Sequence, residues 1–305
     1  MKHPKYFGVI TNREYIKKDK GTDKEKRVPF WEYLDEQPDG WLCSLAYKTK
    51  VVPTDKQMIW DCGAWSYKLE KVPALGKNIV TTDWIIAEYS QYAKPGDFVI
   101  APDHMFISDD VVEERRAFNK QSAIEFLAPA KGAGFVPMAV VHGVDLEEKL
   151  KRCQELVDLG YEAISLGGLA FRASSQKSKA IDFVRQVRNE FPDVWLHVLG
   201  LSAPSYVAQW NDIGVDSFDG ASHFKQAFTG GAYYMYEEDN KKLAKYKAAK
   251  LAENEEITAP ICKCKACSTL RTEDIDTRTY GSNENNMGRA AHNMNHLIKN
   301  LNDLK

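Results

Sequence analysis

The chain has 305 residues, of which 44% are hydrophobic, and a formal net charge of −2. A chain of this length can bury a full core, either as one large domain with an appendage or as two domains. Its charge argues against a protein that coats nucleic acid through bulk positive charge, although a local basic patch is compatible with it. No apolar run approaches the roughly 18 residues of a membrane span, and residues 1–4 lack a signal-peptide pattern, so we expect a cytoplasmic protein.

Short and nearly continuous apolar segments alternate with amphipathic helical patterns, which is typical of a parallel sheet covered on both faces. Eight such segments within the first 220 residues predict a (β/α)8 barrel rather than an open sheet. The predicted strands are residues 7–11, 41–46, 58–61, 98–101, 136–141, 163–166, 195–199 and 215–218. The clearest helices are expected at residues 146–159, 181–191 and 204–213. We assign residues 1–235 to the barrel and residues 236–305 to a C-terminal subdomain packed on it.

Carboxylates, histidines and glycines follow several of the predicted strands. These groups are Asp61-Cys62-Gly63-Ala64-Trp65, Asp103-His104, His142-Gly143, Gly167-Gly168-Leu169-Ala170, Gly200-Leu201-Ser202 and Asp219-Gly220. Because the loops after the strands form the catalytic face of a (β/α)8 barrel, we expect these groups to converge on one pocket. Asp219, which ends an apolar run beside a glycine, is the candidate for the reacting residue.

Each of these residues also has a simpler structural interpretation. Asp61, Asp103 and Asp219 could cap the helices that follow them, since Asp is a preferred N-cap residue. Asp61 and Asp103 could instead be partners for buried hydrogen-bond donors. His142 could be a hydrogen-bonded histidine at the barrel rim, and the glycine pair after residue 166 could serve only a tight turn. Their joint occurrence at successive strand ends favours a functional pocket.

Three cysteines, Cys262, Cys264 and Cys267, lie within six residues. Such crowding indicates metal ligation in a reducing compartment rather than a disulfide framework. Three thiolates and one imidazole make a closed tetrahedral set suited to structural zinc. His292 and His296 are both available as the fourth ligand, and three free cysteines without a metal are the alternative.

The order of these motifs resembles the tRNA-guanine transglycosylase superfamily, and most closely the shorter 7-deazaguanine DNA transglycosylases of phages and bacterial DNA-modification clusters. The resemblance runs from about Asp61 to His292. The matching segments are Asp61-Cys62-Gly63-Ala64-Trp65 (Asp-Ser-Gly-Gly-aromatic), Asp103 (the base-recognition Asp), His142-Gly143 (Gln-Gly), Gly167-Gly168-Leu169-Ala170 (Gly-Gly-Leu-Ala), Leu199-Gly200 (Met-Gly), Phe218-Asp219 (Phe-Asp) and His292-Asn293 (His-Asn).

The resemblance implies exchange of a guanine in a nucleic acid for a 7-deazaguanine base. Breaking the bond between C1′ and N9 passes through a transition state with oxocarbenium character, for which a retaining enzyme uses a nucleophilic carboxylate and a second group for proton transfer. Asp219 would be the nucleophile that forms a covalent glycosyl-enzyme. Asp61 would take the N9 proton of the incoming base.

The remaining motif residues would form the base pocket. Asp103 would accept from N1-H and the exocyclic amine, and the amide of Gly168 in the Gly167-Gly168 loop, with His142, would donate to O6. Trp65 and Leu199 would sandwich the ring. In the C-terminal subdomain the resemblance favours His292 as the fourth zinc ligand, with His296 as the alternative, and gives the zinc a structural role.

Reaching such a pocket requires an extruded base or a single-stranded substrate. The tRNA enzymes of the family follow the nucleophile with Pro-Thr-Arg, whereas residues 221–225 here are Ala-Ser-His-Phe-Lys, which favours DNA and leaves tRNA as the alternative. Enzymes that take an aminomethyl base carry a Glu shortly after Gly-Gly-Leu-Ala. Here Phe171-Arg172-Ala173 follows, which predicts the neutral 7-cyano-7-deazaguanine.

Two stretches are rich in basic residues. Residues 12–40 are predicted to form a long loop that could hold phosphates or be a solvated surface, and its bases are Lys17, Lys18, Lys20, Lys24, Lys26 and Arg27. Residues 241–250 are interpreted as a charged helix surface. Two other functions remain open, namely a non-catalytic, zinc-containing subunit that binds nucleic acid and a barrel glycosidase. A homodimer or a partner subunit is compatible with the sequence.

Overall fold

The computed structural model describes residues 3–11, 14–18, 21, 23–47, 55–107, 112–169, 177–229, 231–250 and 253–304. Its contacts divide the chain into two compact units. The barrel unit contains Met1–Asn12, Asp39–Ser202 and Gln209–Gly220, and the second unit contains Arg13–Pro38, Ala203–Ala208 and Ala221–Lys305. These contacts group residues 221–235 with the C-terminal elements. The domain boundary expected after residue 235 stays a prediction.

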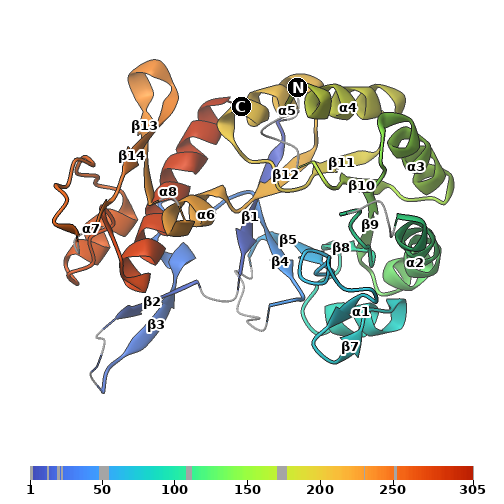
Figure 1. Cartoon of the computed structure of the whole chain (residues 1–305), viewed down its shortest axis with the longest axis horizontal. Coiled ribbons are helices and arrows are strands. Elements are labelled where there is room, and N and C mark those ends of the chain that lie inside the picture. The colour runs from blue at the N-terminus through green and yellow to red at the C-terminus, as the bar shows by residue number, and fades with distance from the viewer. Residues whose placement is uncertain are drawn as a thin grey trace. The chain divides into compact units, whose positions relative to one another are not determined.

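Eight parallel strands close into a barrel, which confirms the predicted (β/α)8 fold (Figure 1). The strands are β1 (Lys5–Ile10), β4 (Gly40–Ser44), β5 (Gln57–Asp61), β8 (Phe98–Ile100), β9 (Val136–Val141), β10 (Ala163–Leu166), β11 (Trp195–Val198) and β12 (Ser217–Gly220). Their order around the barrel is β1-β12-β11-β10-β9-β8-β5-β4. Each overlaps one predicted strand, so the apolar runs identified all eight.

Helices connect most of the successive strands. They are α1 (Thr82–Tyr89), α2 (Val112–Gly132), α3 (Leu146–Asp158), α4 (Lys177–Glu190) and α5 (Pro204–Ile213). Helices α2, α3 and α4 lie outside the strands in Figure 1. Thr81 caps α1 by accepting from the backbone N–H of Trp84 at 3.3 Å, and Asp145 caps α3 by accepting from Glu148 N–H at 2.8 Å. The three predicted helices correspond to α3, α4 and α5.

The core of the barrel unit is built from strand residues such as Phe7, Ile59, Val99, Ile164 and Phe218, which are all fully buried. Burying one such side chain stabilises the fold by about 1.5–3 kcal/mol. The strands therefore form a rigid support, from whose carboxyl ends polar side chains project.

The second unit is organised around its longest helix, α8 (Asn283–Leu304), which contacts elements on several sides. These elements are β2 (Tyr15–Lys18), η1 (Phe30–Tyr33), α6 (Ser222–Thr229), β13 (Ala232–Glu237), β14 (Lys242–Lys247), α7 (Lys265–Arg271) and β16 (Thr279–Tyr280). Almost every α8 residue from Asn286 to Leu301 is buried. Within the described residues, no helix combines the length and apolarity that crossing a membrane requires.

The basic stretch at residues 241–250 was predicted to be a helix, and this prediction is wrong. The stretch contains strand β14 and the short strand β15 (Ala249–Lys250). Strand β14 pairs antiparallel with β13, whose sequence Ala-Tyr-Tyr-Met-Tyr-Glu has high strand propensity. The prediction failed because pairing with a neighbouring strand outweighs the local helix propensity of lysine and alanine.

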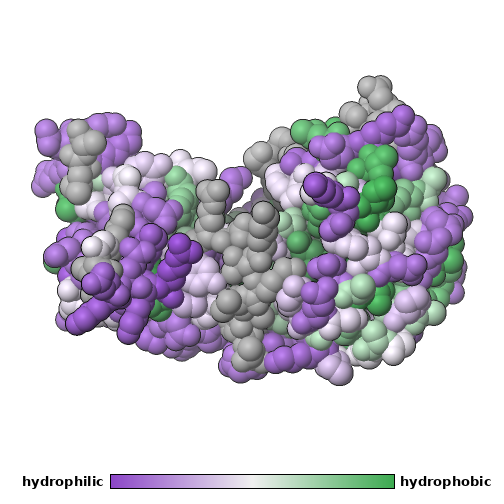
Figure 2. All heavy atoms as spheres, turned by 90° about the horizontal axis from the view of Figure 1, so that it is seen from below, coloured by the Kyte–Doolittle hydropathy of each residue, from purple (hydrophilic) through white to green (hydrophobic). Residues whose placement is uncertain are grey.

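The predicted loop at residues 12–40 contains a hairpin of β2 and β3 (Lys26–Pro29) followed by η1. Figure 2 shows mostly hydrophilic side chains over the left side of the view, where the hairpin lies. Lys17 pairs with Glu25 at 2.9 Å, and Lys18 pairs with Glu273. These acids offset part of the positive charge, and the phosphate-binding role of the segment stays a prediction. Lys20 lies outside the described residues.

Candidate active site and metal centre

Asp219 lies inside β12 and is 5% exposed. Its Oδ1 accepts a hydrogen bond of 2.7 Å from the backbone N–H of Gly200 and lies 3.2 Å from Nε2 of His197. Gly200 has a φ of +75°, a conformation that favours glycine and directs its N–H toward the carboxylate. Because α6 begins only at Ser222, Asp219 is a strand residue held by two polar groups rather than a helix cap.

Asp61 ends β5, and its Oδ2 accepts from Gly63 N–H at 3.0 Å. Burial of the carboxylate, and next the negative charge of Asp103, raise the pKa of Asp61 to about 7. Asp219 contributes in the same direction, so Asp61 lies near enough to interact with both of the other carboxylates. A group with this pKa exists in both protonation states near neutral pH, and it can therefore donate and accept a proton.

Asp103 is 5% exposed, and both of its carboxylate oxygens are engaged. Oδ2 lies 2.6 Å from His142 Nε2, and Oδ1 accepts from the thiol of Cys62 at 3.0 Å. Burial, with the charge of Asp103, raises the pKa of Cys62 well above its usual value, so this group remains a thiol that donates. The barrel thus brings Asp103 and His142 into direct contact, as the convergence of strand ends predicted.

Asp61 and Asp103 do not cap the helices that follow them. Thr81 caps α1, the helix after Asp61, and α2, the helix after Asp103, begins at Val112. The helix-capping interpretation is therefore wrong for both carboxylates. Both carboxylates instead accept hydrogen bonds from nearby donors, as the other structural interpretation expected, and their catalytic and base-binding roles stay predictions.

A cavity of about 280 Å³ lies beside His142. It is lined by Met105, Phe106, Ile107, His142, Gly143, Lys149, Gly167 and Gly168. A Cβ at Gly167 would approach Cε1 of His142 to 2.9 Å, so a side chain there would displace the imidazole. Gly168 is exposed, and no atom lies within 4 Å of the position of a Cβ. The predicted pocket residues His142, Gly167 and Gly168 therefore surround one cavity of suitable size for a flat base.

The two residues predicted to sandwich the base differ in exposure. Trp65 is 56% exposed, and the ammonium of Lys68 lies 4.2 Å from the centroid of its ring. Leu199 is half-buried, and its N–H donates to Leu166 O at 3.4 Å. Their stacking role stays a prediction. Residues 170–173, on which the choice of incoming base depends, lie outside the described residues.

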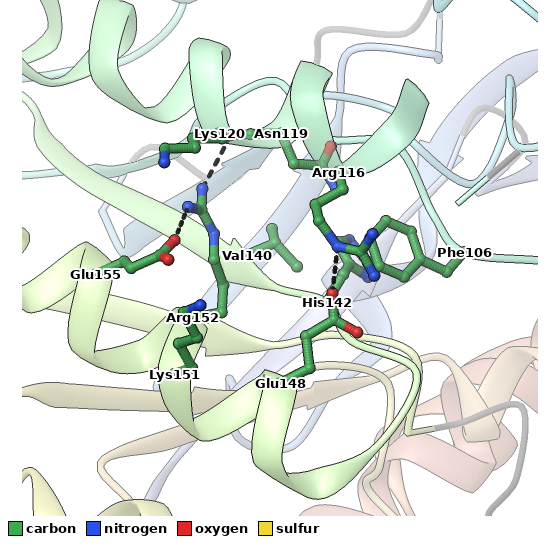
Figure 3. Close-up of a pocket in the computed structure, with 10 residues that line it drawn as sticks. All are labelled: Phe106, Arg116, Asn119, Lys120, Val140, His142, Glu148, Lys151, Arg152 and Glu155. Carbon is green, nitrogen blue, oxygen red and sulfur yellow. Dashed lines mark hydrogen bonds and ion pairs between the residues drawn. The ribbon is translucent and has the colours of Figure 1, made fainter. Parts of the chain in front are cut away.

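A second pocket, of about 270 Å³, also borders His142 and lies between α2 and α3 (Figure 3). Its lining includes four basic side chains, Arg116 and Lys120 of α2 with Lys151 and Arg152 of α3. Glu148 accepts from Arg116 Nε at 2.6 Å, and Glu155 accepts from Arg152 at 2.9 Å. These acids offset part of the charge, and the pair of Arg116 with Glu148 links α2 to α3 at the edge of the site.

His197 was not predicted as a site residue, although its side chain is fully buried beside Asp219. Its Nδ1 lies 2.8 Å from the hydroxyl of Ser217, and that hydroxyl also accepts from Trp195 Nε1 at 2.8 Å. The available signal was a histidine in the middle of the apolar segment 195–199. A titratable residue in a barrel strand is costly to bury unless it has polar partners.

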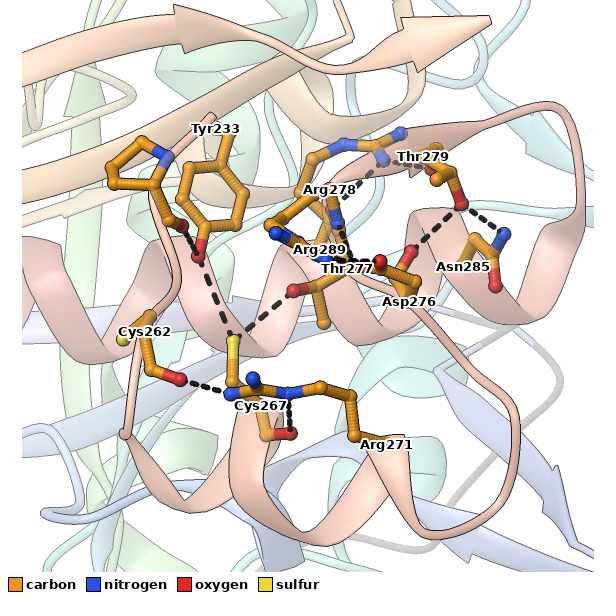
Figure 4. Close-up of polar contacts among 11 residues, drawn as sticks. Tyr233, Cys262, Cys267, Arg271, Asp276, Thr277, Arg278, Thr279, Asn285 and Arg289 are labelled. Atoms are coloured by element: carbon orange, nitrogen blue, oxygen red, sulfur yellow. Dashed lines mark hydrogen bonds and ion pairs between the residues drawn. The ribbon is translucent and has the colours of Figure 1, made fainter. Parts of the chain in front are cut away.

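The predicted cysteines and histidines come together in the second unit, on α7, α8 and the segment before α7. Figure 4 shows two of them, Cys262 and Cys267. Cys262, Cys264, His292 and His296 are buried, and their ligand atoms lie within 4.8 Å of one another, so they could hold a metal ion. Cys267 Sγ lies 3.3 Å from His292 Nδ1. Hydrogen bonds with Cys264 and Cys267 lower the pKa of Cys262, which favours a thiolate in the cluster.

Hydrogen bonds distinguish the two histidines of the cluster. His292 Nε2 lies 2.6 Å from the carbonyl of Tyr234, which can only accept, so Nε2 carries the proton and the Nδ1 lone pair faces the thiols. His296 Nδ1 accepts from the backbone N–H of Tyr236 at 2.9 Å, so in the neutral ring Nε2 carries the proton. That N–H points to Cys262 Sγ at 3.1 Å. The arrangement favours His292 as a ligand and His296 as a donor to a ligand.

Residues 112–305 match the queuine tRNA-ribosyltransferase family. The chain belongs to this family. The matched residues include Asp219 and all members of the thiol and imidazole cluster, whereas Asp61 and Asp103 precede them. The resemblance to the tRNA-guanine transglycosylase superfamily is therefore confirmed.

The chain is also similar to a DNA-guanine transglycosylase of Salmonella montevideo. The two are 25% identical over 183 residues, which cover 58% of this chain and 43% of that protein. The chain thus spans less than half the length of this curated relative.

Proposed function

We propose that the protein exchanges guanine in DNA for a 7-deazaguanine base through a covalent intermediate on Asp219. The observation that carries the proposal is the placement of three interacting carboxylates, Asp61, Asp103 and Asp219, at the carboxyl ends of barrel strands in a chain of this family. The similarity to a DNA-guanine transglycosylase supports DNA as the substrate.

The first half of the reaction begins when the extruded guanine enters the cavity beside His142. Asp219 attacks C1′, the bond between C1′ and N9 breaks, and the electron pair passes to N9. Asp61, whose pKa is about 7, supplies a proton to the departing base. The product is a glycosyl ester of Asp219 together with free guanine.

In the second half, the incoming 7-deazaguanine attacks C1′ through N9, and the ester bond to Asp219 breaks. The carboxylate regains its electron pair, and Asp61 takes the N9 proton and returns to its starting state. Two displacements at C1′ retain the configuration of the sugar. Asp103 and His142 would recognise the amide edge of both bases, since guanine and 7-deazaguanines share that edge.

Exchange in tRNA is the second candidate, favoured by the family name. Against it, His223, which lies where the tRNA enzymes have Pro-Thr-Arg, is fully buried and stacks on Phe30 with ring centroids 5.8 Å apart. A side chain in that position does not reach an anticodon. We therefore place DNA first.

The metal cluster would hold zinc through Cys262, Cys264, Cys267 and His292. Buried thiols and an imidazole nitrogen are donors that fit zinc, and a set of four protein ligands, which leaves no position for a substrate, fits a structural role. A bound zinc would supply cross-links among α7, α8 and the segment before α7, and no step of the exchange depends on it.

The test is incubation of the full chain with 7-cyano-7-deazaguanine and either guanine-containing DNA or unmodified tRNA, followed by nucleoside digestion and mass spectrometry. We expect a modified deoxynucleoside from the DNA. A modified ribonucleoside alone would replace DNA by tRNA, and the absence of both products would contradict the exchange reaction. Faster incorporation of the aminomethyl base than of the nitrile would contradict the predicted incoming base.

A further inference from the structure

We propose that His197 is a positioning residue that fixes Asp219 so that Oδ2 is the oxygen that attacks C1′. This inference rests on the proposed function, which it deepens by assigning the two oxygens of the nucleophile separate tasks. The geometry that carries it is a chain of hydrogen bonds running from Trp195 through Ser217 and His197 to Asp219.

The chain of hydrogen bonds has one direction. Trp195 Nε1 can only donate, so the hydroxyl of Ser217 accepts from it at 2.8 Å and has its own proton free. That proton is directed to Nδ1 of His197, which lies 2.8 Å away. Neutral His197 then carries its proton on Nε2 and donates to Oδ1 of Asp219 at 3.2 Å. The reverse tautomer would place two lone pairs against each other at Oδ1.

The packing around His197 holds the ring in this orientation. His197 and Ser217 are both fully buried, and the ring of Phe7 meets the imidazole edge to face with centroids 6.1 Å apart. His197 and Ser217 are also direct neighbours in the register of β11 and β12. The backbone of the barrel therefore determines the distance from the imidazole to the carboxylate.

The two oxygens of Asp219 have different partners. Oδ1 receives both the Gly200 N–H, at 2.7 Å, and the His197 N–H. Among the described residues, no hydrogen-bond donor meets Oδ2. Two donors on one oxygen stop rotation of the carboxylate and leave the other oxygen with its lone pairs available. Oδ2 forms the bond to C1′ as the bond from C1′ to N9 breaks, and the same oxygen leaves when the incoming base attacks.

The first arm of the test needs no activity. Nitrogen NMR of the full chain labelled at histidine should show His197 protonated at Nε2 and unprotonated at Nδ1, with an Nε2 proton signal that moves in Asp219→Asn. Ser217→Ala should reduce the preference for this tautomer. Protonation of His197 at Nδ1 alone would overturn the inference. So would an Nε2 proton signal that does not shift in Asp219→Asn, and both results are independent of enzyme activity.

The second arm compares His197→Gln, whose amide can donate from nearly the position of Nε2, with His197→Leu, which has similar volume and no donor. Single-turnover release of guanine from DNA should slow about 100-fold in the Leu variant and less than about tenfold in the Gln variant, with KM for DNA unchanged in both. If the two variants have the same melting temperature and release guanine equally slowly, the positioning role is overturned. Full activity of His197→Leu would also overturn it. If the wild type releases no guanine, the proposed function fails, and the NMR arm still decides the hydrogen bond to Asp219.

Discussion

The barrel site and the thiol cluster both gather ionisable side chains away from water, but they distribute their hydrogen bonds differently. In the cluster, both nitrogens of His292 and of His296 have partners, so each ring is fixed. In the barrel, one oxygen of Asp219 meets no hydrogen-bond donor from the part of the chain that the structure describes, and Asp61 has a pKa of about 7. The difference matches the proposed roles, because a structural metal centre is completed by its own side chains, whereas a catalytic site leaves one position for the substrate.

The largest effect is expected from removing the carboxylate of Asp219, whose Oδ2, without a donor among the described residues, distinguishes the barrel site from the thiol cluster. Asp219→Ala should lower exchange by about 10⁴-fold or more, because it removes the carboxylate that is proposed to form the covalent intermediate. Asp182→Ala, on the exposed face of α4, is the matched control and should leave the rate unchanged. Rates measured by nucleoside mass spectrometry test this, and substantial exchange by Asp219→Ala would move the nucleophile to another residue.

The second prediction separates the two histidines of the closed centre. His292→Ala should lose bound zinc, because it removes a ligand, whereas His296→Ala should retain zinc with affinity reduced about 10- to 100-fold, because it removes a donor to Cys262. Metal content after dialysis and competition with a chelator measure both effects. Loss of zinc from His296→Ala alone would make His296 the ligand.

The raised pKa of Asp61 should lower the stability of the folded protein at high pH. Because its pKa rises from 3.8 to about 7 on folding, the native state binds more protons than the unfolded state between these values, and this contribution to stability falls as pH rises. Asp61→Asn should therefore increase the free energy of unfolding at pH 8 by about 2–4 kcal/mol while abolishing exchange. The gain should shrink toward pH 4. Denaturant titrations at both pH values measure this gain in stability. An equal gain at both pH values would show that folding does not raise the pKa of Asp61.

The smallest effect is expected at His142. His142→Gln keeps a donor to Asp103 and should exchange guanine within about tenfold of the wild type, whereas His142→Ala removes the donor and should cost more. KM for the incoming base measures this difference. A wild-type KM in His142→Ala would mean that the contact with Asp103 has no part in base recognition.

The barrel and its strand-end residues could be predicted from the sequence because both depend on local patterns. Buried strands carry continuous apolar runs, and a parallel barrel collects the ends of such strands on one face. Asp61, Asp103 and His142 followed from this geometry, since each lies at or just after a predicted strand.

The features that escaped prediction depend on partners far along the chain. The lysine-rich segment at residues 241–250 forms a strand because β13 pairs with it. The hydrogen bonds of His197 join it to Ser217 and Asp219, which lie about twenty residues further along the chain. The distinction between His292 and His296 rests on backbone groups of β13, at Tyr234 and Tyr236, whose position no spacing in the sequence specifies.

The most direct test of the central claim is to capture the covalent intermediate. The full chain would be mixed with a guanine-containing DNA oligonucleotide without incoming base, quenched in denaturant, digested and mapped by peptide mass spectrometry. We expect a deoxyribosyl adduct on the peptide that carries Asp219, absent from Asp219→Ala and lost when 7-cyano-7-deazaguanine is added before the quench. An adduct on Asp61 or Asp103, or guanine release with no adduct on any peptide, would contradict the assignment of Asp219 as the nucleophile.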